Sequence, residues 1–442
     1  MPGQRPAPRA TRRRRGRGAP GQATPAPARE RRCRERRPSR RGTRARIFSR
    51  VRFTSSFAVF RFDPGEQDLA KPRWLAREGK CAAAEAEYRG ALGRNPDLYA
   101  GWLELFELLR SQRRFQDALE LADAAERHWG QDAAMPHTMR GSALVELGRL
   151  ADGIAELQQA IHLDEYLALA WHEYGFASYR AGHSGEALLA LDRAFGLEPH
   201  TDTLMLRGHI LRESGQYDAA EVAFQGALQA TDHDVPRRDA EREILATRRA
   251  ASLGARRPRD FTARERWFAR DGGVLLVAAA EPAESVPRSM AAAIGSFAAL
   301  AASLGWRPAA LAGAAAADQP LLKTLAAALG VPALGAATLD PADRPLVVTA
   351  RNDGREEWTK QLDRLARWRS GYCFALLQGP EVADGADVVG MGLDLPEDEA
   401  LSALREALRV PADGAGRALD PEITRLAGSP LAAWRQRGTA PR

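Results

Sequence analysis

The chain has few of the residues that build cross-links, metal sites and membrane spans. Its 442 residues include three cysteines, Cys33, Cys81 and Cys373, which stand far apart and form no CxxC pair. We therefore expect neither a disulfide framework nor a zinc site, and a reducing compartment is the simplest inference. No run approaches the roughly 18 apolar residues that a membrane helix needs, and the N-terminus lacks the apolar core of a signal peptide.

Lysine is scarce as well, and the charge is unevenly distributed. Only four lysines stand against 60 arginines. Residues 1–50 hold 18 arginines and two acids, whereas the other 392 residues hold 46 basic and 55 acidic side chains. The basic balance therefore belongs to the N-terminal tail and not to the body of the protein.

The opening stretch, residues 1–46, consists mainly of Arg, Pro, Gly and Ala. Such a composition does not offset the entropy cost of ordering, so we expect residues 1–60 to form a disordered tail. Two interpretations of it stay open. The arginines form an electrostatic arm for nucleic acid, an anionic membrane or an acidic partner, or GC-rich DNA upstream of the true start codon is being read as protein.

Small residues recur at a nearly constant period between residues 66 and 232. Ala91, Ala125, Ala160, Ala194 and Ala227 are spaced by 34, 35, 34 and 33 residues. A glycine or other turn residue and a second set of aromatic and leucine residues recur in phase with them. Such a fixed period predicts a stack of identical structural units.

The best-formed unit covers residues 171–199. Trp171, Tyr174 and Gly175 precede Ala187 and Leu191, and Pro199 ends the unit. The pattern resembles the tetratricopeptide repeat, which reads W-x2-L-G-x2-Y, then A-x3-F, then P. The resemblance implies an all-α solenoid of about five helix-turn-helix repeats over residues 66–232, in which stacked pairs share one continuous core.

A charged helix follows the repeats. Residues 237–257 carry a narrow apolar stripe of Ile244, Leu245 and Leu253 in otherwise polar surroundings. We expect residues 237–268 to supply a capping helix and a linker, with the helix closing the last hydrophobic face and turning a polar side to water.

The family resemblance also implies where a partner binds. The first helices of such repeats line a concave face, which suits an extended or helical peptide with apolar anchors. Each of these side chains has the alternative role of packing between helices. The predicted partner-binding residues are Glu107, Arg110, Met135, Thr138, Ser142, His172, Phe176, Tyr179, Met205, His209 and Arg212.

Two special sites are not expected in the repeats. A subfamily that grips a C-terminal carboxylate uses Lys and Asn, but the concave positions hold no Lys, and Asn95 and Asn352 are the only asparagines. All eight histidines lie in the repeat region, but none forms the i, i+4 pairing with a Glu that a helical zinc site shows. We predict neither a metal nor a cofactor.

The pattern changes after residue 270. Apolar runs at 272–280, 344–352, 372–379 and 386–394 alternate with helical stretches at 287–305, 319–330, 356–371 and 397–410. This alternation predicts a separate α/β domain with a mostly parallel sheet over residues 270–410, followed by an extension, 411–442.

Ligands of such sheets bind beyond the carboxyl ends of the strands, in the loops at 278–288, 349–357 and 377–385. Arg351, Asn352 and Asp353 form the most polar cluster there. This half has no GxGxxG, no phosphate-binding loop and no His, and its single Cys is Cys373. The sequence therefore shows no catalytic residues.

Taken together, the pattern predicts a cytoplasmic, bacterial scaffold that binds a protein or peptide on the concave face. The alternative is an enzyme or small-ligand sensor in the α/β domain, for which the repeats recruit a substrate or regulator. Nucleic acid is expected only through the Arg-rich tail.

Overall fold

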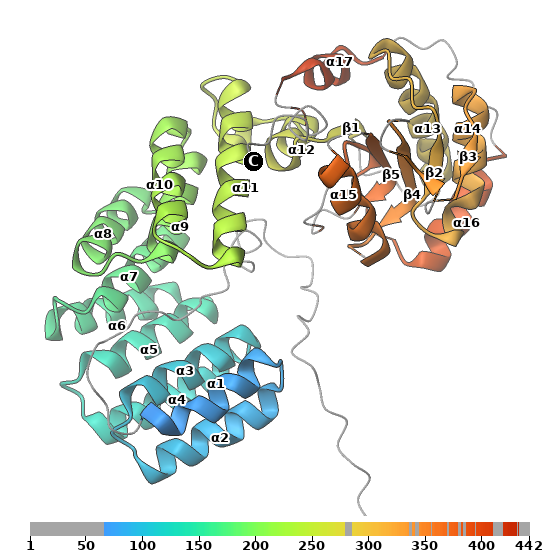
Figure 1. The fold of residues 1–442 in the computed structure, drawn as a ribbon. Helices are drawn as coiled ribbons and strands as arrows, with labels where there is room; N and C mark the ends of the chain where they lie inside the picture. The colour runs from blue at the N-terminus through green and yellow to red at the C-terminus, as the bar shows by residue number, and fades with distance from the viewer. Residues whose placement is uncertain are drawn as a thin grey trace, which may run out of the picture. The chain divides into compact units, whose positions relative to one another are not determined.

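The computed structural model describes residues 66–278, 285–335, 338–340, 344–354, 356–368, 371–378, 382, 386–393, 395–409, 419–430 and 432 (Figure 1). The tail predicted to be disordered, 1–60, lies outside these residues. The described chain divides into two compact units between Arg114 and Phe115.

The first unit contains the beginning of the repeats. A short 3-10 helix, η2 (Glu66–Leu69), leads into α1 (Ala70–Arg77), α2 (Cys81–Arg94) and α3 (Tyr99–Ser111). Glu104 of α3 accepts hydrogen bonds from Arg73 Nη2 at 2.7 Å and from Tyr88 Oη at 2.9 Å. One charged residue thereby connects all three helices.

The cysteines differ in their bonding. Cys81 is disulfide-bonded, whereas Cys373 is a buried free thiol. One disulfide-bonded cysteine does not amount to the disulfide framework that the sequence analysis does not expect.

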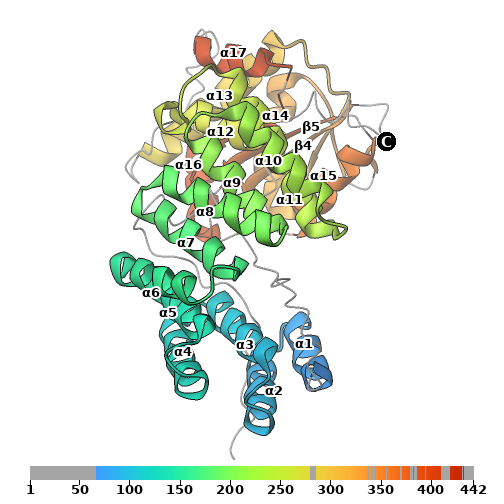
Figure 2. The same ribbon diagram turned by 90° about the vertical axis from the view of Figure 1, so that its left-hand side faces the viewer.

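The second unit continues the helical repeats with seven helices that stack in chain order (Figure 2). Gly148, Gly182 and Gly215 end the first helices α5, α7 and α9 with positive φ angles of 84°, 92° and 81°. Glycine adopts this conformation without steric cost. The helices are α4 (Phe115–Trp129), α5 (Ala134–Glu146), α6 (Leu150–Leu163), α7 (Ala168–Ala181), α8 (Ser184–Leu197), α9 (Thr201–Glu213) and α10 (Tyr217–Gln229).

The helix after the repeats packs on two sides. α11 (Asp234–Ser252) contacts α10 and also α12 (Ala263–Asp271), to which it is joined through η3 (Pro258–Asp260). Ile244 lies in the core of the last repeat, while Leu253 shares a core with Phe268 of α12 and the sheet. From the sequence we expect α11 to turn a polar side to water, but part of that side packs against α12 and the sheet instead.

The α/β part contains a six-stranded sheet in the order β1-β6-β5-β4-β2-β3. Every pair of neighbouring strands is parallel, as the sequence predicts. The strands are β1 (Val274–Val277), β2 (Leu311–Gly313), β3 (Ala333–Leu334), β4 (Leu346–Asn352), β5 (Tyr372–Gln378) and β6 (Val388–Met391).

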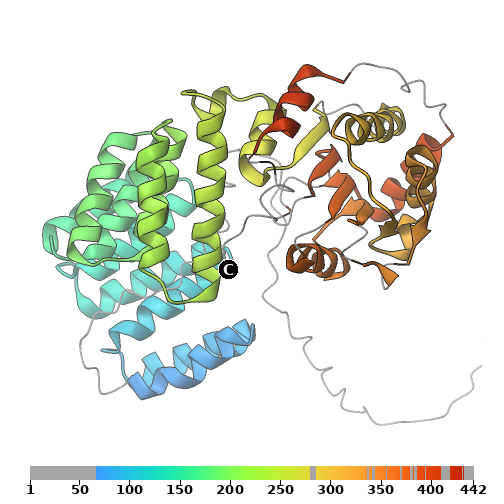
Figure 3. The same cartoon turned by 45° about the horizontal axis from the view of Figure 1, so that its top comes forward.

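Helices pack on both faces of this sheet (Figure 3). Side chains alternate along each strand, so Val348 and Phe374 belong to one core and Val347 and Cys373 to the other. The first core holds side chains of α13 (Val286–Ser303), α14 (Gln319–Leu329), α16 (Glu397–Ala407) and α17 (Pro421–Gly428). The second holds side chains of α12 and α15 (Glu356–Trp368).

Within the described chain, no helix combines the length and the apolar character that crossing a membrane requires.

Candidate functional site

Nine of the eleven predicted partner-binding side chains are buried, and only Glu107 and Arg212 are partly exposed. Those of the second unit lie on α5, α7 and α9, the first helices of three successive repeats. We call the surface formed by these predicted residues of α5, α7 and α9 the first-helix face. Its polar atoms are joined mainly to those of the neighbouring helix.

Between α5 and α7, a buried hydroxyl meets a buried carboxylate. Ser142 Oγ donates a hydrogen bond to Glu173 Oε2 at 2.8 Å, and both residues are about 2% exposed. Nearer the ends of the helices, Arg180 lies 3.6 Å from Glu146 and packs over the ring of Phe176 at 5.6 Å. Glu146 and Glu173 thus add two carboxylates that the sequence-based set omits.

A similar pair of contacts joins α7 and α9. His172 Nδ1 lies 3.0 Å from Thr203 Oγ1, and Tyr179 Oη donates to a carboxylate oxygen of Glu213. His172 is fully buried. Two of the three predicted residues of α7 therefore contact residues that lie one repeat further along the chain.

The last cluster lies between α9 and α11. Arg212 Nη1 donates to Glu243 Oε2 at 2.5 Å, and its Nη2 lies 3.1 Å from His209 Nδ1. Burial lowers the pKa of His209 to about 4, so the imidazole is neutral and accepts from the guanidinium. Although burial opposes it, the charge of Arg212 lowers the pKa of Glu243.

In the first unit, the two predicted residues of α3 bind each other. Arg110 Nη1 donates to Glu107 Oε1 at 2.8 Å, and its guanidinium lies 5.6 Å from the centre of the Phe106 ring. Arg110 is buried although it carries a charge. Packing against the ring and pairing with the carboxylate account for that burial.

Comparison with known proteins identifies the repeats. A family model described as a tetratricopeptide repeat matches residues 201–233, which comprise α9 and α10. This match identifies one tetratricopeptide repeat, and the helix pairs before it follow the same 34-residue pattern. Proteins built of such repeats generally act as protein-interaction scaffolds.

Several proteins are similar to part of this chain. A chicken (Gallus gallus) protein, DnaJ homolog subfamily C member 3, is 25% identical over 128 residues, which are 28% of this chain. The aligned region spans only a quarter (25%) of that relative's length. A tetratricopeptide-repeat protein of Thermus thermophilus is 19% identical, with a TM-score of 0.37 over 41% of this chain and 99% of its own.

Another similar structure is YrrB, described as a tetratricopeptide-repeat protein with an unusual peptide-binding site. It is 19% identical over 39% of this chain and 90% of its own, with a TM-score of 0.27. Each of these matches covers well under half of this chain.

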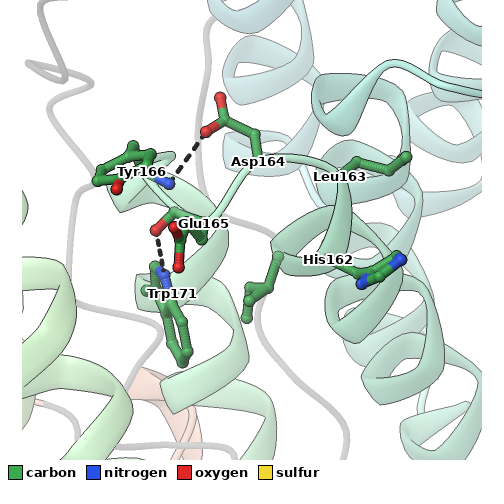
Figure 4. Close-up of a pocket in the computed structure, with 7 residues that line it drawn as sticks. His162, Leu163, Asp164, Glu165, Tyr166 and Trp171 are labelled. Carbon is green, nitrogen blue, oxygen red and sulfur yellow. Dashed lines mark hydrogen bonds between the residues drawn. The ribbon is translucent and has the colours of Figure 1, made fainter.

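A surface hollow of about 470 Å³ lies at the turn between α6 and α7 of the tetratricopeptide repeats (Figure 4). Trp171 Nε1 donates to the carbonyl of Glu165 at 2.8 Å, and the amide of Tyr166 donates to Asp164 Oδ1 at 2.9 Å. Two repeats earlier, Trp102 donates in the same way to the carbonyl of Pro96 at 2.8 Å. The recurrence indicates that Trp171 stabilises the turn between repeats.

The four buried histidines of the repeat region, His137, His172, His200 and His209, serve in packing and hydrogen bonding. His137 Nδ1, for example, lies 2.7 Å from Glu156 Oε2, and His209 packs edge-on against Phe224. Over the part of the chain that the structure describes, no group of three His, Cys, Asp or Glu side chains is arranged to hold a metal ion.

The carboxyl ends of β2, β4 and β5 bring together a second polar cluster. Asp318, 2% exposed, accepts hydrogen bonds from the Ala350 amide at 2.7 Å and the Ala315 amide at 2.8 Å. Burial raises the pKa of Asp318, although these hydrogen bonds oppose the shift. Sequence reasoning missed this residue, because it ends the short 3-10 helix η5 (Ala316–Asp318), which lies outside the three loops predicted to bind ligands.

The three residues of the predicted polar cluster at the end of β4 bind different partners. Arg351 pairs with Asp353 at 2.7 Å, whereas Asn352 Nδ2 donates to Gln378 Oε1 of the neighbouring strand at 2.9 Å. Gln378 is fully buried, and its Nε2 has no hydrogen-bond partner among the described residues. The other predicted loop residues, 279–284, 379–381 and 383–385, lie outside the described residues.

Proposed function

We propose that this chain binds a protein or peptide partner on the first-helix face of its tetratricopeptide repeats. The observation that supports the proposal is the alignment of aromatic and charged side chains from successive first helices. Phe176 and Tyr179 supply apolar and hydrogen-bonding surface, and Arg212 supplies a charge near them. Such a row suits a peptide with apolar anchors at intervals and an acidic group.

A comparative affinity capture tests the proposal. The full chain and a triple variant, His172→Ala, Tyr179→Ala and Arg212→Ala, are used to retain proteins from native cell extract. A matched control carries Leu189→Ala and Val222→Ala on the second helices α8 and α10, where these side chains are 73% and 65% exposed. Circular dichroism first checks that all three proteins are equally helical.

We expect the wild-type chain and the control to retain the same defined protein and the triple variant to lose it by at least tenfold. The triple variant removes the rings of His172 and Tyr179 and the guanidinium of Arg212. Their loss from an interface costs roughly 2 kcal/mol or more of binding free energy, which is enough for a tenfold loss of affinity. Retention of the same partner by the triple variant would exclude the first-helix face as the binding surface.

A second candidate function is favoured by the edge of the sheet. The unpartnered amide nitrogen of Gln378 and the buried Asp318 carboxylate lie on or beside neighbouring parallel strands at their carboxyl ends. Ligands of open parallel sheets bind at this edge. We infer that a small polar molecule with a hydrogen-bond acceptor binds there. The repeats would then recruit the protein that supplies this molecule or the protein that uses it.

Thermal unfolding of the full chain in the presence of nucleotides, sugar phosphates and amino acids tests this second function. A ligand that raises the melting temperature of the wild type and not that of a Gln378→Met variant supports it. If no compound of the panel separates the two proteins, the scaffold function alone remains.

The cytoplasmic location and the bacterial origin stay predictions. Residues 1–50, on which nucleic-acid binding depends, lie outside the described residues, and no similar protein above points to such a role.

A further inference from the structure

The hollow between α6 and α7 has an aromatic wall that is held in place. Trp171 Nε1 donates to the carbonyl of Glu165 at 2.8 Å, and the indole meets the ring of Tyr174 edge-on, with the ring centres 6.5 Å apart. These contacts fix the position of the indole, and part of Trp171 stays accessible at the hollow. A ligand that packs there meets an ordered surface, which lowers the entropy cost of binding.

The corresponding turn two repeats earlier has the same hydrogen bond in different surroundings. Trp102 donates to the carbonyl of Pro96 and is only 8% exposed. In that turn Pro96 takes the place of Glu165, and Asp97 takes the place of Tyr166. The turn between α6 and α7 therefore keeps the structural hydrogen bond and adds a carboxylate and a phenol ring. Because the earlier turn forms without them, these two side chains are not required for the turn itself.

The two added side chains are accessible to a ligand. Tyr166 is 70% exposed, and Glu165 is exposed as well. Within the described chain, neither the carboxylate of Glu165 nor the hydroxyl of Tyr166 takes part in a hydrogen bond or an ion pair. Figure 4 shows Glu165 next to Trp171, with Tyr166 at the edge of the turn. A bound group can therefore contact the carboxylate and the indole together.

The charge around the hollow is negative. Asp164 and Glu165 line it, and its lining includes no Lys or Arg. Residues 150–179 contain five acids and no Lys or Arg, in a chain that holds 64 such cations. The arginines that flank this stretch, Arg149 and Arg180, each lie close to a carboxylate already. Such a lining attracts a cation and repels an anion.

An aromatic face beside a carboxylate favours a guanidinium. The face of an indole attracts a cation, and arginine stacks flat on it while its N–H groups bind a carboxylate. Trp171 and Glu165 line the same hollow and are joined through the Glu165 carbonyl, so one guanidinium reaches both. Ile161 and Leu163 complete the lining with apolar surface, which suits the methylene stem of an arginine.

The openness of the hollow indicates that the cation belongs to a larger partner. A pocket for a free small molecule buries most of the surface of its ligand. This hollow, in contrast, is bordered by the exposed residues Asp164, Glu165 and Tyr166. Tyr166 offers contact area beyond the reach of a single side chain. Such a border suits a protein that packs on the turn and inserts one arginine as an anchor.

We propose that the hollow lined by Trp171, Glu165 and Tyr166 binds an arginine side chain of a partner protein. The guanidinium stacks on the indole and pairs with the Glu165 carboxylate, and the surface of the partner packs on Tyr166. The site lies at the turn between two repeats and uses none of the predicted residues of the first-helix face. It therefore goes beyond the proposed scaffold function and does not depend on it.

Titration of the full chain with a single-arginine probe tests the site. The probe is N-acetyl-arginine amide, and its control is N-acetyl-citrulline amide, which has the same shape without the charge. The readout is the indole N–H resonance of Trp171 in NMR spectra, assigned with a Trp171→Phe variant. We expect a saturable shift with the arginine compound and none with the citrulline compound. Equal shifts with both compounds, or no shift with either, overturn the proposal.

Two variants locate the binding groups. Glu165→Gln keeps the carbonyl that Trp171 binds, and Tyr166→Ser keeps the amide that donates to Asp164. The matched control, Asp132→Asn, removes an exposed carboxylate from the turn between α4 and α5, which has no aromatic residue. We expect Glu165→Gln to weaken probe binding roughly threefold and the control to leave it unchanged. An equal loss in the control would reduce the effect to general charge attraction and contradict a site at the hollow.

A peptide probe separates a protein partner from a free small cation. The arginine is placed between two leucines in a short peptide. We expect this peptide to bind roughly tenfold more tightly than the amide, because the leucines pack on the border of the hollow. Tyr166→Ser should remove most of that gain. If the peptide binds no more tightly than the amide, a free cation is the ligand and the assignment to a protein fails.

The triple variant of the first-helix face separates this site from the proposed function. It carries Trp171, Glu165 and Tyr166 unchanged, so we expect it to bind the arginine probe as the wild type does. If it binds the probe but retains the same partner in the affinity capture, the first-helix face fails and the arginine site stands. If it loses the partner while the wild type binds no probe, the scaffold function stands and the arginine site fails.

Discussion

At the residue scale, glycines set how closely the two helices of a repeat approach. A Cβ atom on Gly141 would lie 2.6 Å from Leu157 Cγ and 2.9 Å from the Gly153 carbonyl oxygen. On Gly175 it would lie 2.8 Å from Leu191 Cγ. These positions recur with the period of the repeat, so the spacing seen in the sequence records a steric requirement.

We expect Gly141→Ala to destabilise the chain by roughly 1 to 3 kcal/mol, because a backbone carbonyl and a buried leucine would both have to shift. Gly185→Ala in α8 is the control, since no atom lies within 4 Å of the added methyl group. The control gains a few tenths to about 1 kcal/mol through the better helix propensity of alanine. Urea denaturation measures both, and a neutral Gly141→Ala would contradict close helix approach.

The buried His209 makes stability depend on pH. Its pKa falls from the usual 6.5 of a histidine to about 4 in the folded chain, because burial disfavours the charged form. Between these values the unfolded chain binds more protons, so the free energy of unfolding falls as the pH drops from 6.5 towards 4. Each pKa unit corresponds to about 1.4 kcal/mol.

We therefore expect wild type to lose about 2 kcal/mol more than a His209→Gln variant between pH 7 and pH 5. Comparing the two chains cancels the effect of the similarly shifted His200 and of the carboxylates. Denaturation curves at several pH values give the difference. Parallel pH profiles of the two chains would show that His209 does not titrate in this range.

At the scale of elements, ion pairs attach the last helix to the sheet. Arg264 of α12 donates to the carbonyls of Leu275 at 3.1 Å and Leu276 at 3.0 Å in β1. Its guanidinium also lies 2.6 Å from Asp420 and 3.3 Å from Glu422 at the start of α17. One side chain thus joins three elements, and Ile423 and Leu426 of α17 complete the contact in the core.

Arg264→Met should release α17 from this attachment while keeping the length and apolar part of the side chain. We expect faster hydrogen exchange in residues 421–428 and a loss of roughly 2 to 4 kcal/mol, because partly buried carbonyls and carboxylates lose their donor. Arg425→Met is the control, since this residue is half-exposed and bonds only through Glu265 and Glu422. Equal effects of both variants would contradict the role of Arg264.

At the scale of the whole second unit, α11 couples the repeats to the sheet. Tyr217 of the last repeat, Ala250 and Leu253 of α11 and its continuation, and Phe268 of α12 belong to one buried cluster with the strands. Tyr217 Oη also donates to the Arg256 carbonyl. A continuous core predicts that the two parts unfold together.

We expect Leu253→Ala to accelerate hydrogen exchange in both α10 and β1, with a cost of about 2 to 5 kcal/mol for a buried leucine. Leu157→Ala is the matched control, because Leu157 lies in a cluster that contains repeat residues alone. That variant should accelerate exchange only in the repeats. If Leu253→Ala leaves β1 unchanged, the shared core does not transmit stability.

The sequence by itself determined the periodic parts of this protein. The 34-residue period located the helix pairs, because each pair has to bury its small residues and leucines against the next. Continuous apolar runs predicted parallel strands, because such strands are covered on both faces. Both patterns are local and repeat along the chain.

Only the tertiary structure decided which side chains meet. The pairing of Arg212 with Glu243 and of Ser142 with Glu173, and the gathering of Asp318 with β4, join residues about 31 positions apart that no local pattern marks. The same holds for the second packing surface of α11 and for the burial of the first-helix face. These features depend on how finished elements pack, since a side chain's partner is set by its neighbours in space and not by its spacing along the chain.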